Sequence, residues 1–174
     1  MRPGWVIGIV VGVALVIDGP PGQSDDSAAQ SFDDPFAYCA AAKTADAPDA
    51  RYHGPAVPDS IARGLQRAIG APPGPLAPFE HSSWRCMDGK VYACTVGANL
   101  PCQSKADASR TPGPGLVTFC TEQPQADVIP AYVTGRETIY TWRCQRGVPT
   151  IERQVAHADA RGFIADIWYE IPPP

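Results

Sequence analysis

Two arginines occupy the same position in a sequence motif that occurs twice, and they are the best candidates for contact with a ligand or partner. Arg85 and Arg143 are the second residues of Trp-Arg-Cys-x-x-Gly, which begins at Trp84 and again at Trp142. In a strand, residues i and i+2 share one face. We therefore expect each Trp and Cys to enter the core of one of two related hairpins, and both arginines to face outward, where Arg is common among binding hot spots.

Serine, histidine and carboxylate residues allow a second hypothesis, a small hydrolase of the cell envelope. Ser82 or Ser83 with His157 and Asp159 would form a Ser–His–Asp arrangement if the fold brought them together. The sequence lacks the G-x-S-x-G elbow that marks many such nucleophiles. No spacing singles out two carboxylates for glycoside hydrolysis either. The sequence leans away from an enzyme, and no catalytic residue is assigned.

Neither a metal nor another cofactor is expected. His53, His81 and His157 are far apart in the sequence, and the cysteines include no close pair of the C-x₂-C kind that is typical of zinc sites. The net charge is −4 and no basic run occurs, which argues against nucleic acid as a partner. The expected partner is an unknown protein or polymer of the bacterial cell envelope, and the oligomeric state stays open.

The N-terminus predicts export. Arg2 precedes an apolar run at residues 5–17, which is 13 residues long. As a helix this run spans roughly 20 Å, short of the ~30 Å hydrocarbon core of a bilayer. We expect a signal peptide at 1–24 and no membrane span after its removal, with an uncleaved anchor at 5–17 as the alternative. A disordered linker at 25–34 and a single domain at 35–174 follow, in the periplasm or outside the cell.

Six cysteines in an exported chain predict three disulfides, and six allow 15 pairings. A two-residue turn at 88–89 places Cys86 opposite Val91 and Cys94 opposite Ser83, so the two thiols lie on opposite faces. A three-residue turn separates them by about 13 Å, beyond the Cα limit near 7 Å. Cys86–Cys94 is excluded on these grounds. Among the remaining pairings we expect Cys86–Cys144, Cys102–Cys120 and Cys39–Cys94.

The elements that would position these residues are helices in the first part of the chain and strands in the second. Apolar spacing and a following Gly70 predict a main helix at 58–69. Shorter helical segments are expected at 35–43 and 115–122, and an ion-paired turn at 159–162. Asp88-Gly89 predicts a type I′ hairpin. The strands expected are 82–86, 90–96, 129–134, 138–144, 150–155 and 162–171. The fold class is α+β, with one antiparallel sheet of about five or six strands.

Four segments of the chain look like those of an uncharacterised family of small secreted bacterial proteins. They are 38–41 (YCAA), 84–94 (WRCMDGKVYAC), 129–135 (IPAYVTG) and 167–171 (IWYEI). The resemblance would cover residues 36–171 and implies export and disulfides, but no activity. The pattern aromatic-x-Cys-x-x-Gly ahead of a strand is also similar to membrane-bound-type lysozyme inhibitors, which are small β-barrels. The helix at 58–69 and four further cysteines depart from that pattern.

Overall fold

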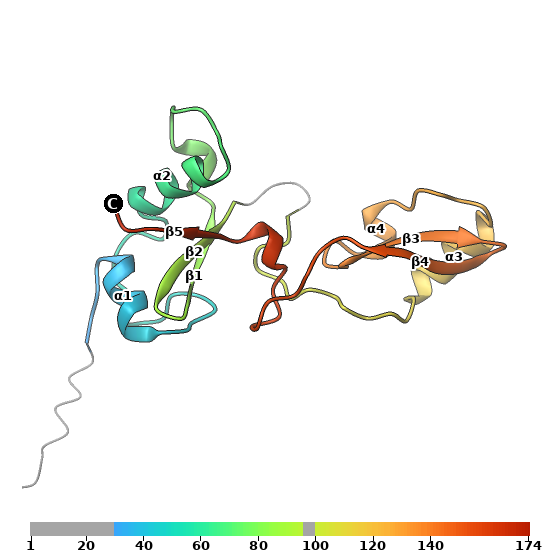
Figure 1. Cartoon of the computed structure of the whole chain (residues 1–174), viewed down its shortest axis with the longest axis horizontal. Coiled ribbons are helices and arrows are strands. Elements are labelled where there is room, and N and C mark those ends of the chain that lie inside the picture. Colours follow the sequence, from blue (N-terminus) through green and yellow to red (C-terminus); the bar gives the residue numbers. More distant parts are fainter. Residues whose placement is uncertain (1–29, 96–99) are drawn as a thin grey trace, which may run out of the picture.

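A computed structural model describes residues 30–95 and 100–174, which form two lobes joined by two crossing segments of chain (Figure 1). The first lobe contains α1 (Pro35–Ala42), α2 (Asp59–Ala68), β1 (Ser83–Met87), β2 (Lys90–Cys94) and β5 (Tyr169–Ile171). The second contains α3 (Pro114–Glu122), α4 (Ala131–Thr134), β3 (Tyr140–Gln145) and β4 (Val148–Gln154). Two short 3₁₀ turns are η1 (Ala77–Phe79) and η2 (Ala165–Ile167). The chain thus leaves the first lobe after β2 and returns to it at β5.

The α+β class is confirmed, but the expected single sheet of five or six strands is wrong. The described residues form two antiparallel sheets, β1-β2-β5 and β3-β4. The segment 129–134 is helical, because Pro130 caps α4 and Gly135 ends it at φ 86°. A single strand over 162–171 is also wrong. Within this segment only the residues of β5 pair with β2, and the 3₁₀ turn η2 precedes them.

Both hairpins close with two-residue turns, and the expected register of the first is confirmed. Cys86 pairs with Val91 and Cys94 with Ser83. Asp88 and Gly89 have φ values of 53° and 81°, as a type I′ turn requires. The second hairpin repeats this geometry at 146–147, with φ values of 52° and 81°. The sequence repeat therefore encodes two copies of one turn.

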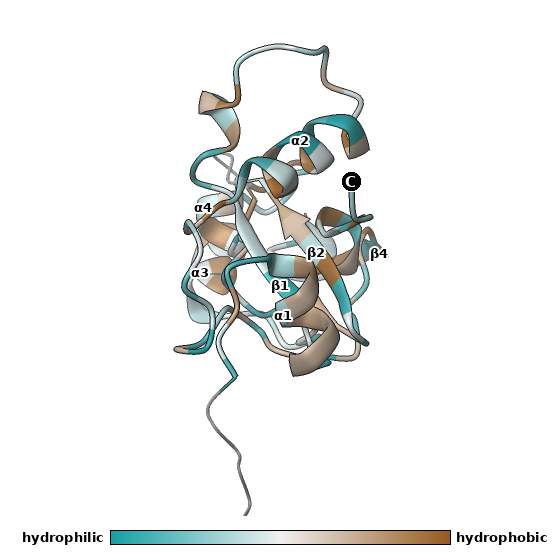
Figure 2. Ribbon diagram, turned by 90° about the vertical axis from the view of Figure 1, so that its left-hand side faces the viewer, coloured by the Kyte–Doolittle hydropathy of each residue, from teal (hydrophilic) through white to brown (hydrophobic). Residues whose placement is uncertain are grey.

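The main helix and both shorter ones are confirmed as α2, α1 and α3. Ile61 and Leu65 bury the apolar stripe of α2. Gly64 on the same helix packs so closely on Ile171 that a Cβ would lie 2.3 Å from its Cγ2 atom. In Figure 2 the first lobe is seen end-on, with α1 and α2 on the β1–β2 hairpin. Helix α2 thereby fixes β5 at the edge of the first sheet.

Each lobe contains the same module of two helices followed by a hairpin. The order α1-α2-β1-β2 is matched by α3-α4-β3-β4. In both copies a disulfide joins the first helix to the first strand, at Cys39–Cys86 and Cys120–Cys144, with Cα separations of 5.1 and 5.2 Å. The third disulfide, Cys94–Cys102, ties the end of β2 to the crossing segment.

The three expected disulfides, Cys86–Cys144, Cys102–Cys120 and Cys39–Cys94, are therefore wrong. The two hairpins lie in different lobes and different sheets, so their equivalent cysteines do not meet across a pseudo-twofold axis. Each pairs instead with the cysteine on the first helix of its own module, α1 or α3. The exclusion of Cys86–Cys94 is confirmed.

Backbone hydrogen bonds extend the repeat with identical spacing. Six residues after the helical cysteine, a carbonyl accepts from the N–H of the strand cysteine: Ala45 from Cys86 (2.9 Å) and Ala126 from Cys144 (2.8 Å). Four residues after it, a carbonyl accepts from the turn glycine: Lys43 from Gly89 (2.8 Å) and Pro124 from Gly147 (3.1 Å). The loop after the first helix is thus fixed to the hairpin in the same way in both modules.

Trp84 and Trp142 are buried beside the cysteines, as expected, with exposed fractions of 4% and 7%. Trp84 belongs to a cluster with Tyr38, Ile61 and Leu65, whereas Trp142 belongs to a separate cluster in the second lobe. The predicted signal peptide (1–24) and anchor (5–17) lie outside the described residues, as do residues 25–29 of the predicted linker. Disorder is wrong for residues 30–34, because Phe32 pairs with Tyr52 and packs on Tyr38.

Candidate functional site

A cavity of about 510 Å³, the first pocket, lies where the first module meets the crossing segments. Its aromatic lining residues are Trp84, Phe163 and Trp168. Its polar lining residues include Asp46, Ser82, Ser83, Gln103 and Lys105. Ligand pockets in proteins have such volumes, and they combine aromatic walls with a few polar groups. The first pocket is therefore the leading candidate site.

Three separate parts of the chain are fixed around this pocket. Trp84 is held by an indole hydrogen bond from its Nε1 to the carbonyl of Ala56 (2.8 Å). Asp46 follows the Ala45 backbone, which bridges to β1 in both directions (2.9 and 3.1 Å). The Cys94–Cys102 disulfide anchors the segment that carries Gln103 and Lys105. The walls are built by backbone pairing and covalent linkage, so the pocket is preformed.

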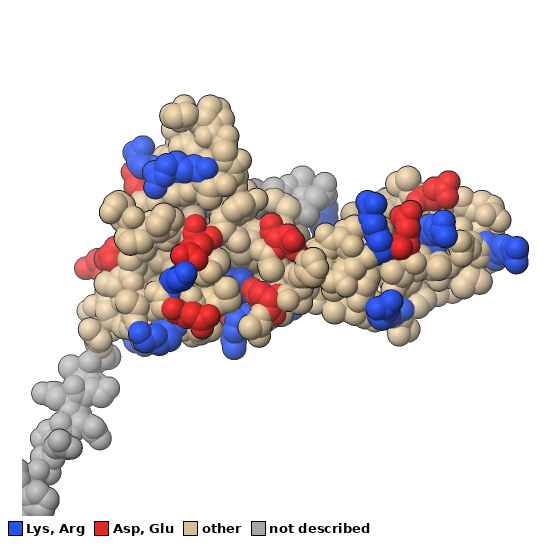
Figure 3. Space-filling view, in the orientation of Figure 1, with Lys and Arg blue, Asp and Glu red and all other residues tan. Residues whose placement is uncertain are grey.

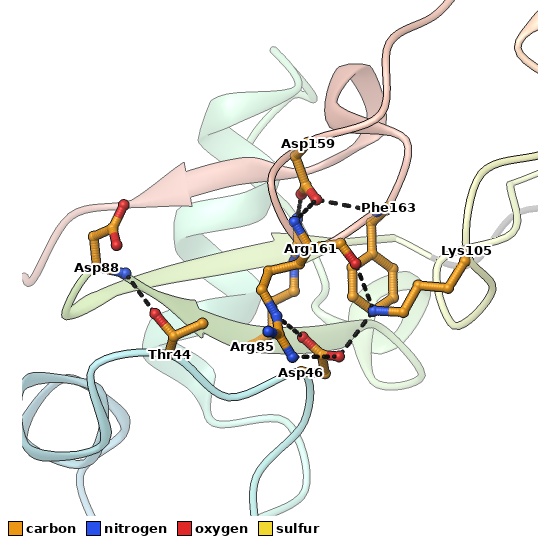
Figure 4. Close-up of polar contacts among 8 residues, drawn as sticks. All are labelled: Thr44, Asp46, Arg85, Asp88, Lys105, Asp159, Arg161 and Phe163. Carbon is orange, nitrogen blue, oxygen red and sulfur yellow. Dashed lines mark hydrogen bonds and ion pairs between the residues drawn. The ribbon is translucent and has the colours of Figure 1, made fainter. Parts of the chain in front are cut away.

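At the rim of the first pocket, two cationic side chains share one carboxylate (Figure 4). The carboxylate of Asp46 accepts hydrogen bonds from Arg161 Nε (2.9 Å) and Nη2 (3.1 Å) and from Lys105 Nζ (2.8 Å). These bonds, Arg161 first and then Lys105, lower the pKa of Asp46 to about 2. Lys105 Nζ also lies 3.4 Å from the centroid of the Phe163 ring. The rim therefore supplies hydrogen-bonding groups that are already engaged in ion pairs, with one net positive charge.

Arg85 lies behind the aromatic wall and not on the surface, which corrects the expectation that it faces outward. Its side chain is 1% exposed, ion-paired with Asp159, and its guanidinium lies 4.3 Å from the centroids of both Phe163 and Trp168. The strand alternation is as expected, but residues 163–168 cover the face that carries Arg85. The expected ion-paired turn at 159–162 exists, with partners elsewhere: Arg85 for Asp159, and Asp46 for Arg161.

Asp159 holds the segment that covers Arg85 in place through hydrogen bonds. Burial works to raise the pKa of this carboxyl, but hydrogen bonds from Arg85 and from the N–H groups of Phe163 and Arg161 outweigh burial and lower it. Its Oδ1 accepts from those N–H groups at 3.0 and 2.8 Å. Asp159 thus keeps its charge and holds Phe163 in place as a wall of the first pocket.

Two lining residues of the first pocket carry buried polar atoms without a hydrogen-bond partner. They are Ser82 Oγ and Trp168 Nε1. A buried polar group left unpaired costs free energy, and such groups are uncommon in native proteins. These atoms mark the first pocket as a place where a ligand would complete the hydrogen bonding.

A second pocket, of about 400 Å³, occupies the equivalent place in the second module. Trp142 corresponds to Trp84, and Thr141 before it corresponds to Ser83. Asp127 stands seven residues after its helical cysteine, as Asp46 does. A cationic side chain, Arg136, lines it as well. Module repetition therefore gives both pockets a tryptophan, a hydroxyl and an aspartate at equivalent positions, whereas the cations Lys105 and Arg136 do not correspond and Glu152 lines the second pocket alone.

Arg143 differs from Arg85 in its surroundings. It is half-buried, pairs across the hairpin with Thr150, and lies on the face of the second sheet opposite Trp142 and Cys144. With the amide of Gln145 turned to match its neighbours, the Gln145 oxygen accepts from Arg143 Nη2 at 2.6 Å. Over the face drawn in Figure 3, basic and acidic side chains are interspersed in both lobes. Arg143 stays a predicted contact at the surface of the second lobe.

The geometry gives no support to a Ser–His–Asp site. Asp159 is engaged with Arg85, and His157 Nδ1 lies 3.7 Å from Asp166, both largely exposed. Within the described part of the chain, no serine hydroxyl is hydrogen-bonded to a histidine, and no group of three or more His, Cys, Asp or Glu side chains could hold a metal. Ser82 lines the first pocket, whereas Asp159 lies outside its lining and holds Phe163 in place.

Sequence reasoning missed Asp46, Lys105, Phe163 and Asp127 as site residues. One signal was available: aromatic-Cys-x₅-Ala-Asp occurs at 38–46 and again at 119–127. Together with Trp-Arg-Cys-x-x-Gly it marks both pockets, because the Ala pairs with the strand cysteine and the Asp follows it. Phe163 and Lys105 carry no comparable signal, since they reach the pocket through the crossing segments.

No known protein family, curated protein or solved structure matches this chain. The resemblances to small secreted bacterial proteins and to lysozyme inhibitors therefore stay predictions. Across residues 30–95 and 100–174, no helix is long and apolar enough to cross a membrane.

Proposed function

We propose that this chain is an exported, disulfide-stabilised binding protein of the bacterial cell envelope, and that its first pocket holds a neutral, hydroxyl-bearing ring such as a sugar. The observation that carries the proposal is the pairing of aromatic walls with unpartnered polar atoms in one preformed cavity. Three disulfides fit an oxidising compartment outside the cytoplasm.

The lining favours a ligand that is apolar on its faces and polar on its edges. A sugar ring has C–H groups on its faces and hydroxyls around its edge. Trp84 and Trp168 offer rings for the faces, and large aromatic side chains contribute much of the energy at such contacts. Ser82 and Gln103 offer neutral groups that both donate and accept, as hydroxyls require. Aromatic walls with neutral polar edges match this amphipathic shape.

Charge at the rim argues for a neutral ligand. Asp46 is paired with both Lys105 and Arg161, so each charged group at the rim has a partner, and the three together carry one net positive charge. This excess repels a cationic ligand, and an anionic ligand would have to compete with Asp46 for the two cations and leave its carboxylate without a partner. A hydroxyl can instead add to the network as a further donor or acceptor.

The test is calorimetric titration of the oxidised protein with chitotriose and cellotriose, and with tri-alanine as a peptide control. The blocking variant is Ala47→Trp, because Ala47 is exposed at the pocket lining and a bulky ring there fills the cavity. Ala108→Trp is the matched control, at an exposed alanine away from the pocket. Unchanged thermal unfolding shows that both variants fold.

We expect a trisaccharide to bind the wild type and Ala108→Trp, and Ala47→Trp to lose the first-pocket site. Ser82→Ala should weaken this binding roughly threefold to tenfold, the effect of one neutral hydrogen bond. Its stability should not fall, because the removed hydroxyl has no partner. Binding of tri-alanine alone, or first-pocket binding that persists in Ala47→Trp, would contradict the proposal.

A further inference from the structure

The two pockets share the part of their walls that the repeated module builds, whereas the lining residues Gln103, Lys105, Phe163 and Trp168 of the first pocket have no equivalent in the second. In each copy the disulfide and two hydrogen bonds fix the loop after the first helix to the hairpin. The residue that follows the bonded alanine is Asp46 in one copy and Asp127 in the other. The pocket tryptophan stands two residues before the strand cysteine in both. The correspondence covers the aspartate and the tryptophan of each pocket.

We infer that the chain is bivalent: the second pocket binds the same class of ring as the first, and the two together hold two units of one linear polymer with repeating units. The inference rests on the proposed function of the first pocket and extends it to a second site. Thr141 takes the place of Ser83 as a hydroxyl beside the tryptophan. Thr134 and Thr138 add further hydroxyls, which suit the same neutral, hydroxylated ligand.

Direct hydrogen bonds connect the two crossing segments between the modules. The N–H of Ala106 donates to the carbonyl of Gly162 at 2.7 Å, and Lys105 Nζ donates to the carbonyl of Arg161 at 2.8 Å. On the second-module side, Asp107 bonds through its N–H to the carbonyl of Glu137 and through its carbonyl to the N–H of Ile139 (2.7 and 3.1 Å). These bonds fix the position of one pocket relative to the other.

Two sites whose relative position is fixed favour a ligand that reaches both. Once one unit is bound, the second binding event becomes intramolecular, and its effective concentration depends on whether the ligand spans the sites. Two weak sites in one chain then give strong binding to a long polymer and weak binding to a short oligomer. Two separate small molecules would gain nothing from this arrangement.

The chain offers a matched pair of blocking variants for the test. Ala47 and Val128 occupy equivalent positions, each directly after the pocket aspartate, and both are exposed. The proteins to compare are wild type, Ala47→Trp, Val128→Trp, the double variant, and Ala108→Trp as the control. Each is titrated calorimetrically with chitotriose and with long soluble chitin oligomers, or with the cello-series if that is the trisaccharide bound.

We expect two trisaccharide sites in the wild type, one in each single variant and none in the double variant. Long oligomers should bind the wild type at least about tenfold more tightly than either single variant. A single site that Ala47→Trp removes and Val128→Trp leaves intact, with no gain for long oligomers, would overturn bivalency while the proposed function stands. Absence of binding to every oligomer would overturn both.

Discussion

Arg85 on β1 is ion-paired with Asp159, 74 residues further along the chain, and both side chains are buried between the first sheet and the returning segment. Phe163 and Trp168, which follow Asp159, cover the guanidinium. The pair therefore fastens the C-terminal part of the chain onto the first module. It also sets the position of two aromatic walls of the first pocket.

Replacing the two arginines of the repeated motif should have very different effects on stability. Arg85→Ala leaves Asp159 as a buried charge without its partner, and breaking a buried pair in this way costs about 3–5 kcal/mol. Arg143→Ala removes a half-exposed side chain and should cost less than about 1 kcal/mol. Guanidinium denaturation of the oxidised proteins measures both. Equal losses for the two variants would contradict the buried role of Arg85.

Stability should fall as the pH drops from about 4 toward 2, and Asp46 should contribute to that fall. Hydrogen bonds from Arg161 and Lys105 lower its pKa from 3.8 to about 2 in the folded protein. A carboxyl with a depressed pKa stabilises the fold above its unfolded pKa and loses this contribution as the pH falls through its folded pKa. Asp46→Asn should flatten the dependence of Tm on pH between 4 and 2. An unchanged slope would rule out this contribution.

Non-reducing peptide mapping should find Cys39–Cys86, Cys94–Cys102 and Cys120–Cys144. Their sequence separations are 47, 8 and 24 residues. On the chain-entropy model these loops correspond to about 4, 2.5 and 3.5 kcal/mol of stabilisation. Replacing each pair by alanines should therefore destabilise most for Cys39–Cys86 and least for Cys94–Cys102. The reverse order, measured by denaturation, would count against this connectivity.

The second hairpin turn offers a stabilising substitution. Arg146 adopts φ 52°, a left-handed conformation that costs a non-glycine residue free energy, whereas Asn tolerates it. Arg146→Asn should stabilise the protein by about 0.5–1 kcal/mol. Asp88→Asn at the equivalent position of the first hairpin is the control and should change stability little, because Asp already tolerates this conformation. Destabilisation by Arg146→Asn would argue against the type I′ turn.

Local signals in the sequence predicted the local elements correctly. Turn residues at 88–89 gave the register of the first hairpin, and apolar spacing ended by Gly70 gave α2. The inward position of each Trp and Cys followed from strand alternation alone. The segment 129–134 is the exception, because Pro130 begins a helix there although the composition favours a strand.

The features that the sequence did not predict depend on contacts between residues far apart in the chain. Arg85 and Arg143 have identical immediate neighbours, yet one is buried and the other half-exposed, because residues 163–168 pack on the first hairpin and not on the second. Two of the disulfides join a helix to the hairpin of the same module, and the repeated hairpin motif alone does not indicate that module. Only the recurrence of aromatic-Cys-x₅-Ala-Asp, read together with that repeat, carries this information in the sequence.

The most direct test of the proposed binding site is a titration of the ¹⁵N-labelled protein with chitotriose or cellotriose, followed through the indole N–H signals of its tryptophans. Trp84 and Trp168 line the first pocket, so both signals should move in a saturable, dose-dependent way. If neither signal moves at saturating sugar, the first pocket is not the binding site.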